Sequence, residues 1–481
     1  MAKCTIILKD EVNCKVEGLD LDTRKKLVNK LSYFLPHAYH TPAYKLGRWD
    51  GKVNFFTVGG VTYTNLLEDI IPIIVADGYE IDIDDHRTHH DLEFVQVDES
   101  TFAHKVWPAG HPVEGQPVVL RDYQIEIINK FLETPMALQE VATGAGKTLI
   151  TAGLSSTVEK YGRSIVIVPN KDLVKQTYAD YVNLGLDVGV YYGDKKDIGK
   201  THTICTWQSL NSIKKKFREA ESEMSLQDFA DDVVCVIVDE VHQAKADVLK
   251  EILTKDFAHI PLRWGLTGTI PKAEHEKASL RACLGEVVNQ LAAKDLQDMG
   301  VLSNCHVNII QLKEVGEYNN YQSELAYLTT DKKRMEYIAS TIKTIAQSGN
   351  TLVLVDRIKA GDILLEHIED AQFVNGDSKD RKDKYDQINE GTNQVLVATY
   401  GVAAVGINIP RIFNLVLLEP GKSFVRVIQS IGRGVRKASD KDHVEIYDIA
   451  STAKYSKKHL TERKRFYKEA NYPFTITKVD Y

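Results

Sequence analysis

The sequence predicts an α/β protein in which two parallel-sheet lobes follow a small α+β domain. Residues 233–238 read VVCVIV, an almost unbroken apolar run typical of a strand buried on both faces of a parallel sheet. Similar runs at Ser164–Val168 and Thr351–Val355 are followed by helical patterns, which indicates repeated strand–helix units. A chain of 481 residues, 43% of them hydrophobic, has enough core for about three domains. The expected divisions are a domain at 1–110, lobes at 111–302 and 303–450, and a basic tail at 451–481.

Charge and cysteine usage restrict the class of protein. The net charge is −7 and the pI about 6.1, so any basic surface for nucleic acid must be local. The six cysteines form no CxxC pair, which favours buried thiols in a reduced compartment. No stretch approaches about 18 apolar residues, and the opening residues MAKCTIILKD lack the apolar centre of a signal peptide. We therefore expect a soluble cytoplasmic protein with no membrane partner.

Short strand and helix patterns alternate in the first 110 residues. The expected elements are strands at Thr5–Leu8, Val53–Val58 and Tyr79–Ile83 and helices at Asp22–Leu35 and Leu66–Ala76. Asp-Gly before the second of these strands is a hairpin-turn signal. Two interpretations stay open: the turn presents Lys45, Arg48 and Lys52 to phosphates beside the Trp49 ring, or Trp49 simply packs in the core. The segment Trp107–Pro117, rich in Pro and Gly, is expected to be a linker.

Residues 140–148, EVATGAGKT, stand between a predicted strand and a helix expected at Leu149–Ser155. A glycine turn there directs several backbone N–H groups into one concavity, and the helix N-terminus adds its positive dipole end, so the site suits a phosphate. Lys147 would reach the outer phosphates, and the Thr148 hydroxyl would hold Mg²⁺. The strict phosphate-loop pattern has Gly where this chain has Val141. An ordinary glycine turn is the alternative, but it does not require Lys-Thr after Gly146.

Asp239 and Glu240 follow the apolar run at 233–238. Adjacent acids at a strand end are often only solvated. Paired with a phosphate loop earlier in the chain, they indicate a nucleoside triphosphatase: Asp239 would bind Mg²⁺, and Glu240 would polarise the attacking water.

The remaining segments continue the alternation of strands and helices. The expected strands are Ser164–Val168, His202–Thr206, Thr351–Val355, Gln372–Val374, Val395–Ala398 and Asn414–Leu418. The expected helices are Ile213–Asp232, Leu280–Met299, Asp362–Glu369 and Val425–Arg436, with Ser303–Glu317 as a bridge between the lobes.

The order of the motifs resembles that of superfamily 2 helicases. The glycine loop, the acidic strand end Asp239-Glu240-Val241-His242, the LTGT run at 266–269 and the QSIGRGVR run at 429–436 occur in that family's order, and they span most of the chain. The resemblance implies two tandem RecA-like lobes with ATP in the cleft between them. It implies that Thr143, Gly144, Ala145 and Gly146 cradle the phosphates, while Gln124 and Arg121 lie near the adenine.

The same resemblance implies nucleic-acid contacts at strand ends and arginines that act on ATP. The implied backbone contacts are Pro169, Asn170, Lys171, Gln176, Thr206, Gln208, Ser209 and Thr399. Gly406 would lie close to the nucleotide, but Asn408 stands where many relatives carry Asp, which puts sugar recognition there in doubt. Gln429, Arg433 and Arg436 share one helix face, and the arginines would meet the γ-phosphate. Arg436 is favoured as the arginine finger.

Over the whole chain the resemblance is to UvsW-type phage recombination helicases. It rests on the WDG hairpin at 49–51, the compact core and the short basic tail at 454–468. It implies an enzyme that uses ATP and Mg²⁺ on branched or forked DNA, tracking a single strand: fork regression, Holliday-junction branch migration and R-loop unwinding. Recombination or replication proteins would be its partners in the host cytoplasm.

Three other interpretations remain open. One is a DExH-type RNA helicase, because these motifs contact the backbone and do not separate DNA from RNA. The second is an ATP-gated annealing or clamp protein without unwinding, against which the complete set of catalytic residues argues. The third is a restriction-complex motor, although the chain shows no nuclease or methyltransferase motif.

Overall fold

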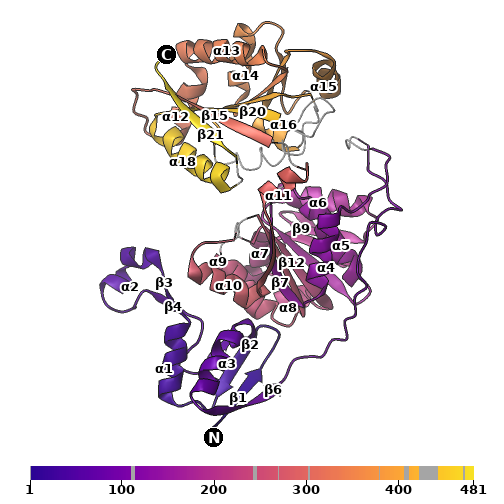
Figure 1. Ribbon diagram of the computed structural model, residues 1–481, viewed down its shortest axis with the longest axis vertical. Helices are drawn as coiled ribbons and strands as arrows, with labels where there is room; N and C mark the ends of the chain where they lie inside the picture. The colour runs from indigo at the N-terminus through magenta and orange to yellow at the C-terminus, as the bar shows by residue number, and fades with distance from the viewer. Residues whose placement is uncertain are drawn as a thin grey trace. The chain divides into compact units, whose positions relative to one another are not determined.

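The computed structural model describes residues 2–109, 114–142, 144–241, 246–268, 270–301, 304–378, 380–405, 411–421, 443–469 and 472–481. The chain divides into two compact units, residues 1–141 with 146–290 and residues 291–481 with 142–145. The first unit contains the N-terminal domain (2–85) and lobe 1 (117–290), and the second contains lobe 2 (291–481); Figure 1 shows their elements. The predicted fold class, two parallel-sheet α/β lobes after a small α+β domain, is confirmed.

The N-terminal domain is a four-stranded sheet with strand order β5-β2-β1-β6 and a core closed by two helices. Leu27 from one helix and Ile70 and Ile74 from the other are fully buried against the sheet. Its elements are β1 Ala2–Leu8, β2 Asn13–Glu17, α1 Leu21–Lys30, β3 Ser32–Phe34, η1 Pro36–His40, α2 Pro42–Lys45, β4 Lys52–Asn54, β5 Val61–Tyr63, η2 Thr64–Leu66, α3 Leu67–Ala76 and β6 Tyr79–Asp85.

Strands β3 and β4 form a separate antiparallel hairpin whose long connection contains η1 and α2. The expected helix at Asp22–Leu35 was therefore too long, because the chain leaves α1 after Lys30 and residues 32–34 pair with 52–54. The expected strand Val53–Val58 was also too long: Phe55 and Phe56 are buried in the domain core outside β4. We call residues 32–54, which are this hairpin and its connection, the knob; Figure 1 shows α2 at its tip.

The N-terminal domain packs firmly on lobe 1. Ala278 and Ala282 of α10 (Glu274–Leu284) belong to the same hydrophobic cluster as the domain's own core. The Asn65 amide donates to the Arg281 carbonyl oxygen at 3.0 Å, and the Lys250 ammonium lies 4.2 Å from the centroid of the Phe55 ring. These contacts make the domain and lobe 1 one body rather than two parts joined by a linker.

The segment between the domain and lobe 1 is also packed. The Val97 backbone N–H donates to the Asn129 side-chain oxygen at 2.8 Å, and the Phe94 ring lies 6.2 Å from that of Trp264, which is fully buried. The expected linker at Trp107–Pro117 folds back on itself through a bridge between Val106 and Pro117. A cut at residue 110 would therefore remove side chains that cover lobe 1.

Lobe 1 is built on an eight-stranded sheet with the order β10-β9-β11-β8-β12-β13-β7-β14. The pairs from β9 to β7 are parallel, whereas β10 is antiparallel to β9. Its elements are α4 Asp122–Leu132, β7 Met136–Val141, α5 Lys147–Val158, β8 Arg163–Val168, α6 Lys171–Asn183, β9 Val188–Tyr192, β10 Lys195–Lys196, β11 His202–Thr206, α7 Trp207–Arg218, α8 Leu226–Phe229, β12 Val233–Asp239, α9 Ala246–Glu251, η4 Ile252–Asp256, β13 Leu262–Thr267, α10 Glu274–Leu284 and β14 Val287–Leu291.

Two helices expected in lobe 1 were wrong. The single helix expected at Leu280–Met299 is α10, then the strand β14, then α11 (Ala293–Asp298). The helix expected at Ile213–Asp232 is instead α7, which begins at Trp207, followed by the short α8. In both cases one continuous helix was predicted across a point where a helix ends and another element begins.

The buried His202 makes the stability of lobe 1 depend on pH. Its Nδ1 lies 2.7 Å from Ser164 Oγ and its Nε2 lies 3.1 Å from Glu159 Oε2. Burial lowers the pKa of His202, and the Glu159 carboxylate offsets only part of that effect. The unfolded histidine binds a proton near pH 6.5, whereas the folded one binds it only at lower pH. The free energy of unfolding therefore decreases as the pH falls below about 6.5.

We expect His202→Gln to flatten this pH dependence. Urea unfolding of the parent between pH 7.5 and 5.5 should lose up to about 1.4 kcal/mol per pH unit from this group inside the titration window. The variant should lack that part of the slope. Glu159→Gln, which removes the carboxylate that favours the charged ring, should steepen the loss. Equal slopes in all three proteins would contradict the assignment.

Lobe 2 is a seven-stranded, fully parallel sheet with the order β17-β18-β16-β19-β20-β15-β21. Its elements are α11 Ala293–Asp298, β15 Asn304–Leu312, α12 Tyr321–Thr330, α13 Lys332–Ala346, β16 Thr351–Val355, α14 Ile358–His367, β17 Gln372–Val374, α15 Arg381–Glu390, β18 Val395–Thr399, α16 Tyr400–Val405, β19 Asn414–Leu418, β20 His443–Ser451, α18 Lys454–Glu469 and β21 Phe474–Val479. The expected bridge at Ser303–Glu317 was wrong, because β15 lies inside this sheet between β20 and β21.

The C-terminal residues 451–481 are part of lobe 2 and not a separate tail. Strand β21 pairs with β15, and α18 packs on the sheet through Leu460 and Tyr467. The buried Arg463 guanidinium donates to both Asp448 carboxylate oxygens, at 2.8 and 2.9 Å. The basic helix α18 thus packs on lobe 2 through these buried residues. None of the helices in the described residues combines the length and apolar character needed to cross a lipid bilayer.

Candidate nucleotide site and nucleic-acid contacts

The predicted motif residues of lobe 1 gather at one edge of its sheet. Strands β7, β8, β11, β12 and β13 run parallel, so their carboxyl ends share that edge. The register places Thr267 opposite Glu140 and Leu266 opposite Asp239. Segments about 130 residues apart in the chain therefore meet beside the glycine loop, as expected for a ligand site of a parallel α/β sheet.

Two glycines in left-handed conformations shape the loop between β7 and α5. The φ angle is +92° at Gly144 and +78° at Gly146. A Cβ atom at Gly146 would lie 2.7 Å from Gln124 Nε2, so a larger residue there would displace that side chain. The loop thus leads directly into the N-terminus of α5 at Lys147, with the glutamine of the preceding helix packed against it.

Gln124 and Arg121 stand at the beginning of α4. The Gln124 side-chain oxygen accepts a hydrogen bond from the Arg121 backbone N–H at 3.0 Å, and Gln124 is 4% exposed. The Arg121 guanidinium donates to the Tyr123 hydroxyl at 3.2 Å. The pair expected near the adenine is therefore adjacent to the glycine loop, and the role in base recognition remains a prediction.

Lys147 and Glu240 form a buried ion pair at the centre of the site. Their side chains are 10% and 7% exposed, and the ammonium also donates to the Val141 carbonyl oxygen at 3.3 Å. The other carboxylate oxygen of Glu240 accepts from the Gly268 backbone N–H at 3.2 Å. One carboxylate therefore connects the phosphate-loop lysine to Gly268, which follows β13.

Glu140 is a site residue that the sequence motifs did not single out. Its Oε1 accepts a hydrogen bond from the Ile270 backbone N–H at 3.3 Å. Glu240 holds Gly268 from the β12 side and Glu140 holds Ile270 from the β7 side, on either side of β13. The one available signal was its position immediately before the glycine loop.

Asp239 and Thr148 are half-buried at this edge. Their carboxylate and hydroxyl oxygens are the donor types that Mg²⁺ prefers, so these residues fit the predicted cation. The other predicted ATP-site residues lie outside the described residues: Thr143, Gly406, Gln429, Arg433 and Arg436. Their roles remain predictions.

The predicted nucleic-acid contacts of lobe 1 lie at two helix N-termini on the same edge. Asn170 Oδ1 accepts from the Leu173 N–H at 3.1 Å and so caps α6. Thr206 Oγ1 accepts from the Ser209 N–H at 3.3 Å and caps α7. Pro169 is buried and Gln176 and Ser209 are half-buried, whereas Lys171 and Gln208 are exposed. Helix N-termini of this kind suit phosphate groups.

In lobe 2, Thr399 is the last residue of β18, at the carboxyl edge of its sheet. It stands opposite Val355 of β16 and is half-buried. This is the position expected for a backbone contact.

In the knob, Lys45, Arg48 and Lys52 are exposed, and Trp49 is half-buried. The Trp49 indole N–H donates to the Lys52 carbonyl oxygen at 2.9 Å, and Asp50 accepts from the Lys52 N–H at 3.0 Å. Trp49 thus braces the turn that carries the three cations.

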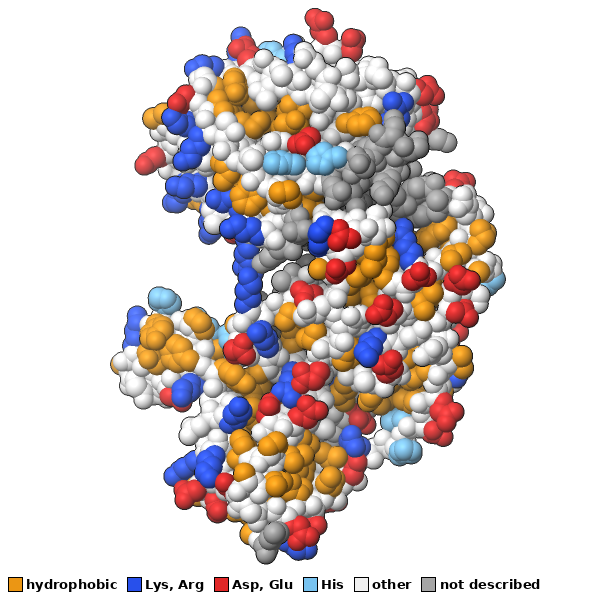
Figure 2. Space-filling view, in the orientation of Figure 1, with side chains coloured by type: hydrophobic (Ala, Val, Ile, Leu, Met, Phe, Trp, Pro, Cys, Tyr) orange, Lys and Arg blue, Asp and Glu red, His pale blue; other side chains and the backbone are white. Residues whose placement is uncertain are grey.

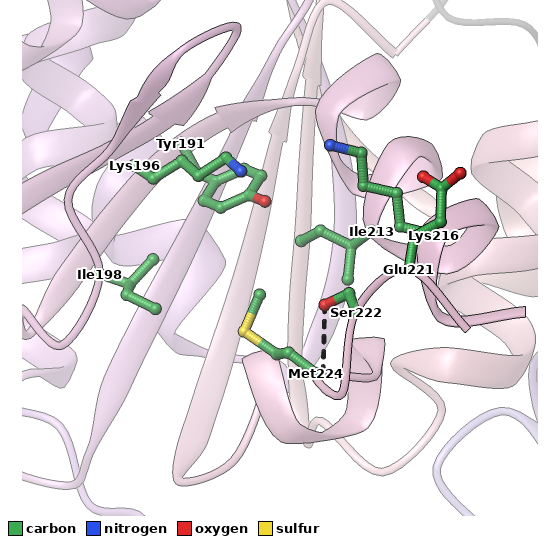
Figure 3. A pocket seen from close by; sticks show the side chains of 8 residues that line it. All are labelled: Tyr191, Lys196, Ile198, Ile213, Lys216, Glu221, Ser222 and Met224. Carbon is green, nitrogen blue, oxygen red and sulfur yellow. Dashed lines mark hydrogen bonds between the residues drawn. The ribbon is translucent and has the colours of Figure 1, made fainter. Parts of the chain in front are cut away.

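A separate cavity of about 190 Å³ lies near the β10 edge of lobe 1 (Figure 3). Tyr191, Ile213 and Met224 form its apolar wall, and Lys196, Lys216 and Glu221 stand around it. The glycine loop, Asp239 and Glu240 contribute no side chain to it, so this cavity is not the nucleotide site.

Comparison with known proteins identifies the class. Residues 117–272 match the family described as type III restriction enzyme, res subunit, and residues 333–438 match the helicase conserved C-terminal domain. These two domains, on two parallel-sheet lobes with the glycine loop and the acidic strand end in place, make the chain an ATP-dependent helicase of superfamily 2.

One relative that the chain resembles along most of its length is the ATP-dependent DNA helicase uvsW of Enterobacteria phage T4. The two are 24% identical over 450 residues, covering 88% of this chain and 86% of the relative. The DNA 3'-5' helicase XPB of Kineococcus radiotolerans is 24% identical over 75% of this chain and 65% of its own length. The DNA-bound restriction-modification enzyme LlaBIII shares the fold, with a TM-score of 0.52 at 14% identity over 86% of this chain and 34% of that one.

Proposed function

We propose that this helicase acts on branched DNA, driving fork regression, Holliday-junction branch migration and R-loop unwinding with ATP and Mg²⁺. The observation that carries the proposal is the match to the phage T4 DNA helicase, which covers 88% of the chain and so reaches beyond the two helicase domains. The local basic surface of the knob supports a nucleic acid as partner, since the chain as a whole carries a charge of −7.

The proposed mechanism of ATP hydrolysis begins from the ion pair between Lys147 and Glu240. An arriving triphosphate competes with Glu240 for the Lys147 ammonium, because both offer anionic oxygens to one cation. Once Lys147 turns to the phosphates, the Glu240 carboxylate is released to accept a proton from the attacking water. Thr148 and Asp239 would hold Mg²⁺, which would neutralise phosphate charge when bound.

The same exchange transmits the nucleotide state to the rest of lobe 1. Glu240 also accepts from the Gly268 N–H, so its movement loosens or tightens the backbone at Gly268. The helix N-termini capped by Asn170 and Thr206 at this edge hold the DNA backbone. The predicted residues Gln429, Arg433 and Arg436 complete the reaction from lobe 2.

The test is ATP hydrolysis titrated with single-stranded DNA, duplex DNA, a four-way junction and RNA of matched sequence. A junction labelled to report strand exchange is followed in parallel. We expect the strongest stimulation and ATP-dependent movement with branched DNA. Stimulation by RNA alone would assign the chain to the RNA helicases, and stimulation by every DNA without junction movement would remove the branch-specific activity.

A further inference from the structure

The knob differs in charge from the rest of the chain. Between residues 32 and 54 it contains three Lys or Arg residues, two histidines and one acid, Asp50. The Asp50 carboxylate already accepts from the Lys52 N–H, and within the described residues Lys45, Arg48 and Lys52 form no ion pair with a carboxylate. The knob is therefore a local cationic surface on an acidic protein, as an electrostatic site for phosphates requires.

Two large apolar side chains lie open among these cations. Tyr39 is 58% exposed and Leu46, next to Lys45, is 65% exposed. Figure 2 shows a hydrophobic patch over this part of the molecule with histidine and basic side chains at its margin. A water-exposed aromatic side chain on a cationic surface is typical of sites on which unpaired bases stack.

The exposed tyrosine is held rigidly. Its ring centroid lies 4.9 Å from that of Phe34 and 5.4 Å from that of Tyr44, and these two lie 5.8 Å apart. Gly51, at φ +79°, packs beneath them: a Cβ there would lie 2.5 Å from Phe34 and 3.0 Å from Tyr44. Because Tyr39 is already ordered, a base that stacks on its open side loses little side-chain entropy.

We propose that the knob is a base-stacking site, in which Tyr39 and Leu46 receive unpaired bases at a DNA branch while Lys45, Arg48 and Lys52 hold the flanking phosphates. This inference rests on the proposed activity on branched DNA. It names the residues through which the N-terminal domain would bind that DNA. Trp49 contributes by bracing the turn.

The test measures binding of forked DNA carrying unpaired bases by fluorescence anisotropy. Tyr39→Ala should weaken binding about tenfold, the expected cost of one lost base–aromatic stack, and Leu46→Ser should weaken it in the same direction. Tyr39→Phe keeps the ring and should bind as the parent does. Ile83→Ser, a change at a 68% exposed apolar residue on β6, should leave binding unchanged.

The outcomes separate this inference from the proposed function. Tyr39→Ala and Leu46→Ser variants that bind DNA as tightly as the parent overturn the stacking site, whatever the junction assay shows. Weakened binding by both variants supports the site, even if the parent moves no junction and the branch-migration proposal fails. Should Tyr39→Ala lower the melting temperature, Leu46→Ser carries the test, since Leu46 takes no part in the aromatic cluster.

Discussion

Lys147→Ala is expected to lower ATP turnover by a factor of roughly 10² to 10³, the cost of removing one electrostatic contact to the developing phosphate charge. The side chain is 90% buried at the start of α5, behind the left-handed Gly146, so water cannot take its place with the same geometry. Steady-state hydrolysis with saturating DNA measures the loss. A variant that turns over ATP within tenfold of the parent would contradict the role of Lys147.

The same substitution has a structural effect that must be separated from the catalytic one. It leaves the Glu240 carboxylate buried without its cation, which should lower the free energy of unfolding by about 3 kcal/mol. Adding Glu240→Gln removes that charge, so the double variant should regain most of the stability and none of the hydrolysis. A double variant as unstable as Lys147→Ala alone would show that the pair is not what stabilises the loop.

The parts of this structure that could be predicted are those encoded locally. The strand β12 was expected at Val233–Val238 and observed at Val233–Asp239, because an almost unbroken apolar run of this length suits a strand covered on both faces. The glycine loop and the acidic pair are also local in the sequence, because each is a short motif at the end of a strand. Because parallel strands end at the same edge of their sheet, the loop and the acidic pair are both expected at the carboxyl edge.

The parts that were missed depend on partners distant in the chain. Strand β15 shows alternating buried residues, yet its neighbours β20 and β21 begin at His443 and Phe474, and no local pattern points to them. The sequence of α18 contains many basic residues and does not distinguish Arg463 from the others. Arg463 is buried because it bonds to Asp448 on β20, which is distant in the chain. Strand β14 lies at the edge of the sheet and is mostly half-exposed, so its pattern resembled the helices on either side.

Glu240→Gln is expected to separate ATP binding from ATP turnover. The Glu240 backbone has φ +53°, a left-handed conformation that costs a non-glycine residue on the order of 1 kcal/mol and is retained chiefly at functional sites. Glutamine has the same shape but cannot take a proton from water. Turnover should therefore fall by about 10³, while affinity for a fluorescent ATP analogue stays close to that of the parent.

The amide also weakens the contact to the Gly268 N–H, and this second effect needs its own control. Glu140→Gln makes the same change in the carboxylate that accepts from the Ile270 N–H, on β7 at the other side of β13. If loosening of the backbone after β13 were the whole cause, both variants would lose turnover alike. If Glu240 activates water, Glu240→Gln alone should reach the large loss and accumulate bound, unhydrolysed ATP in a single-turnover experiment. Rapid hydrolysis in that experiment, with slow release of ADP, would instead assign Glu240 to the step that reopens the site.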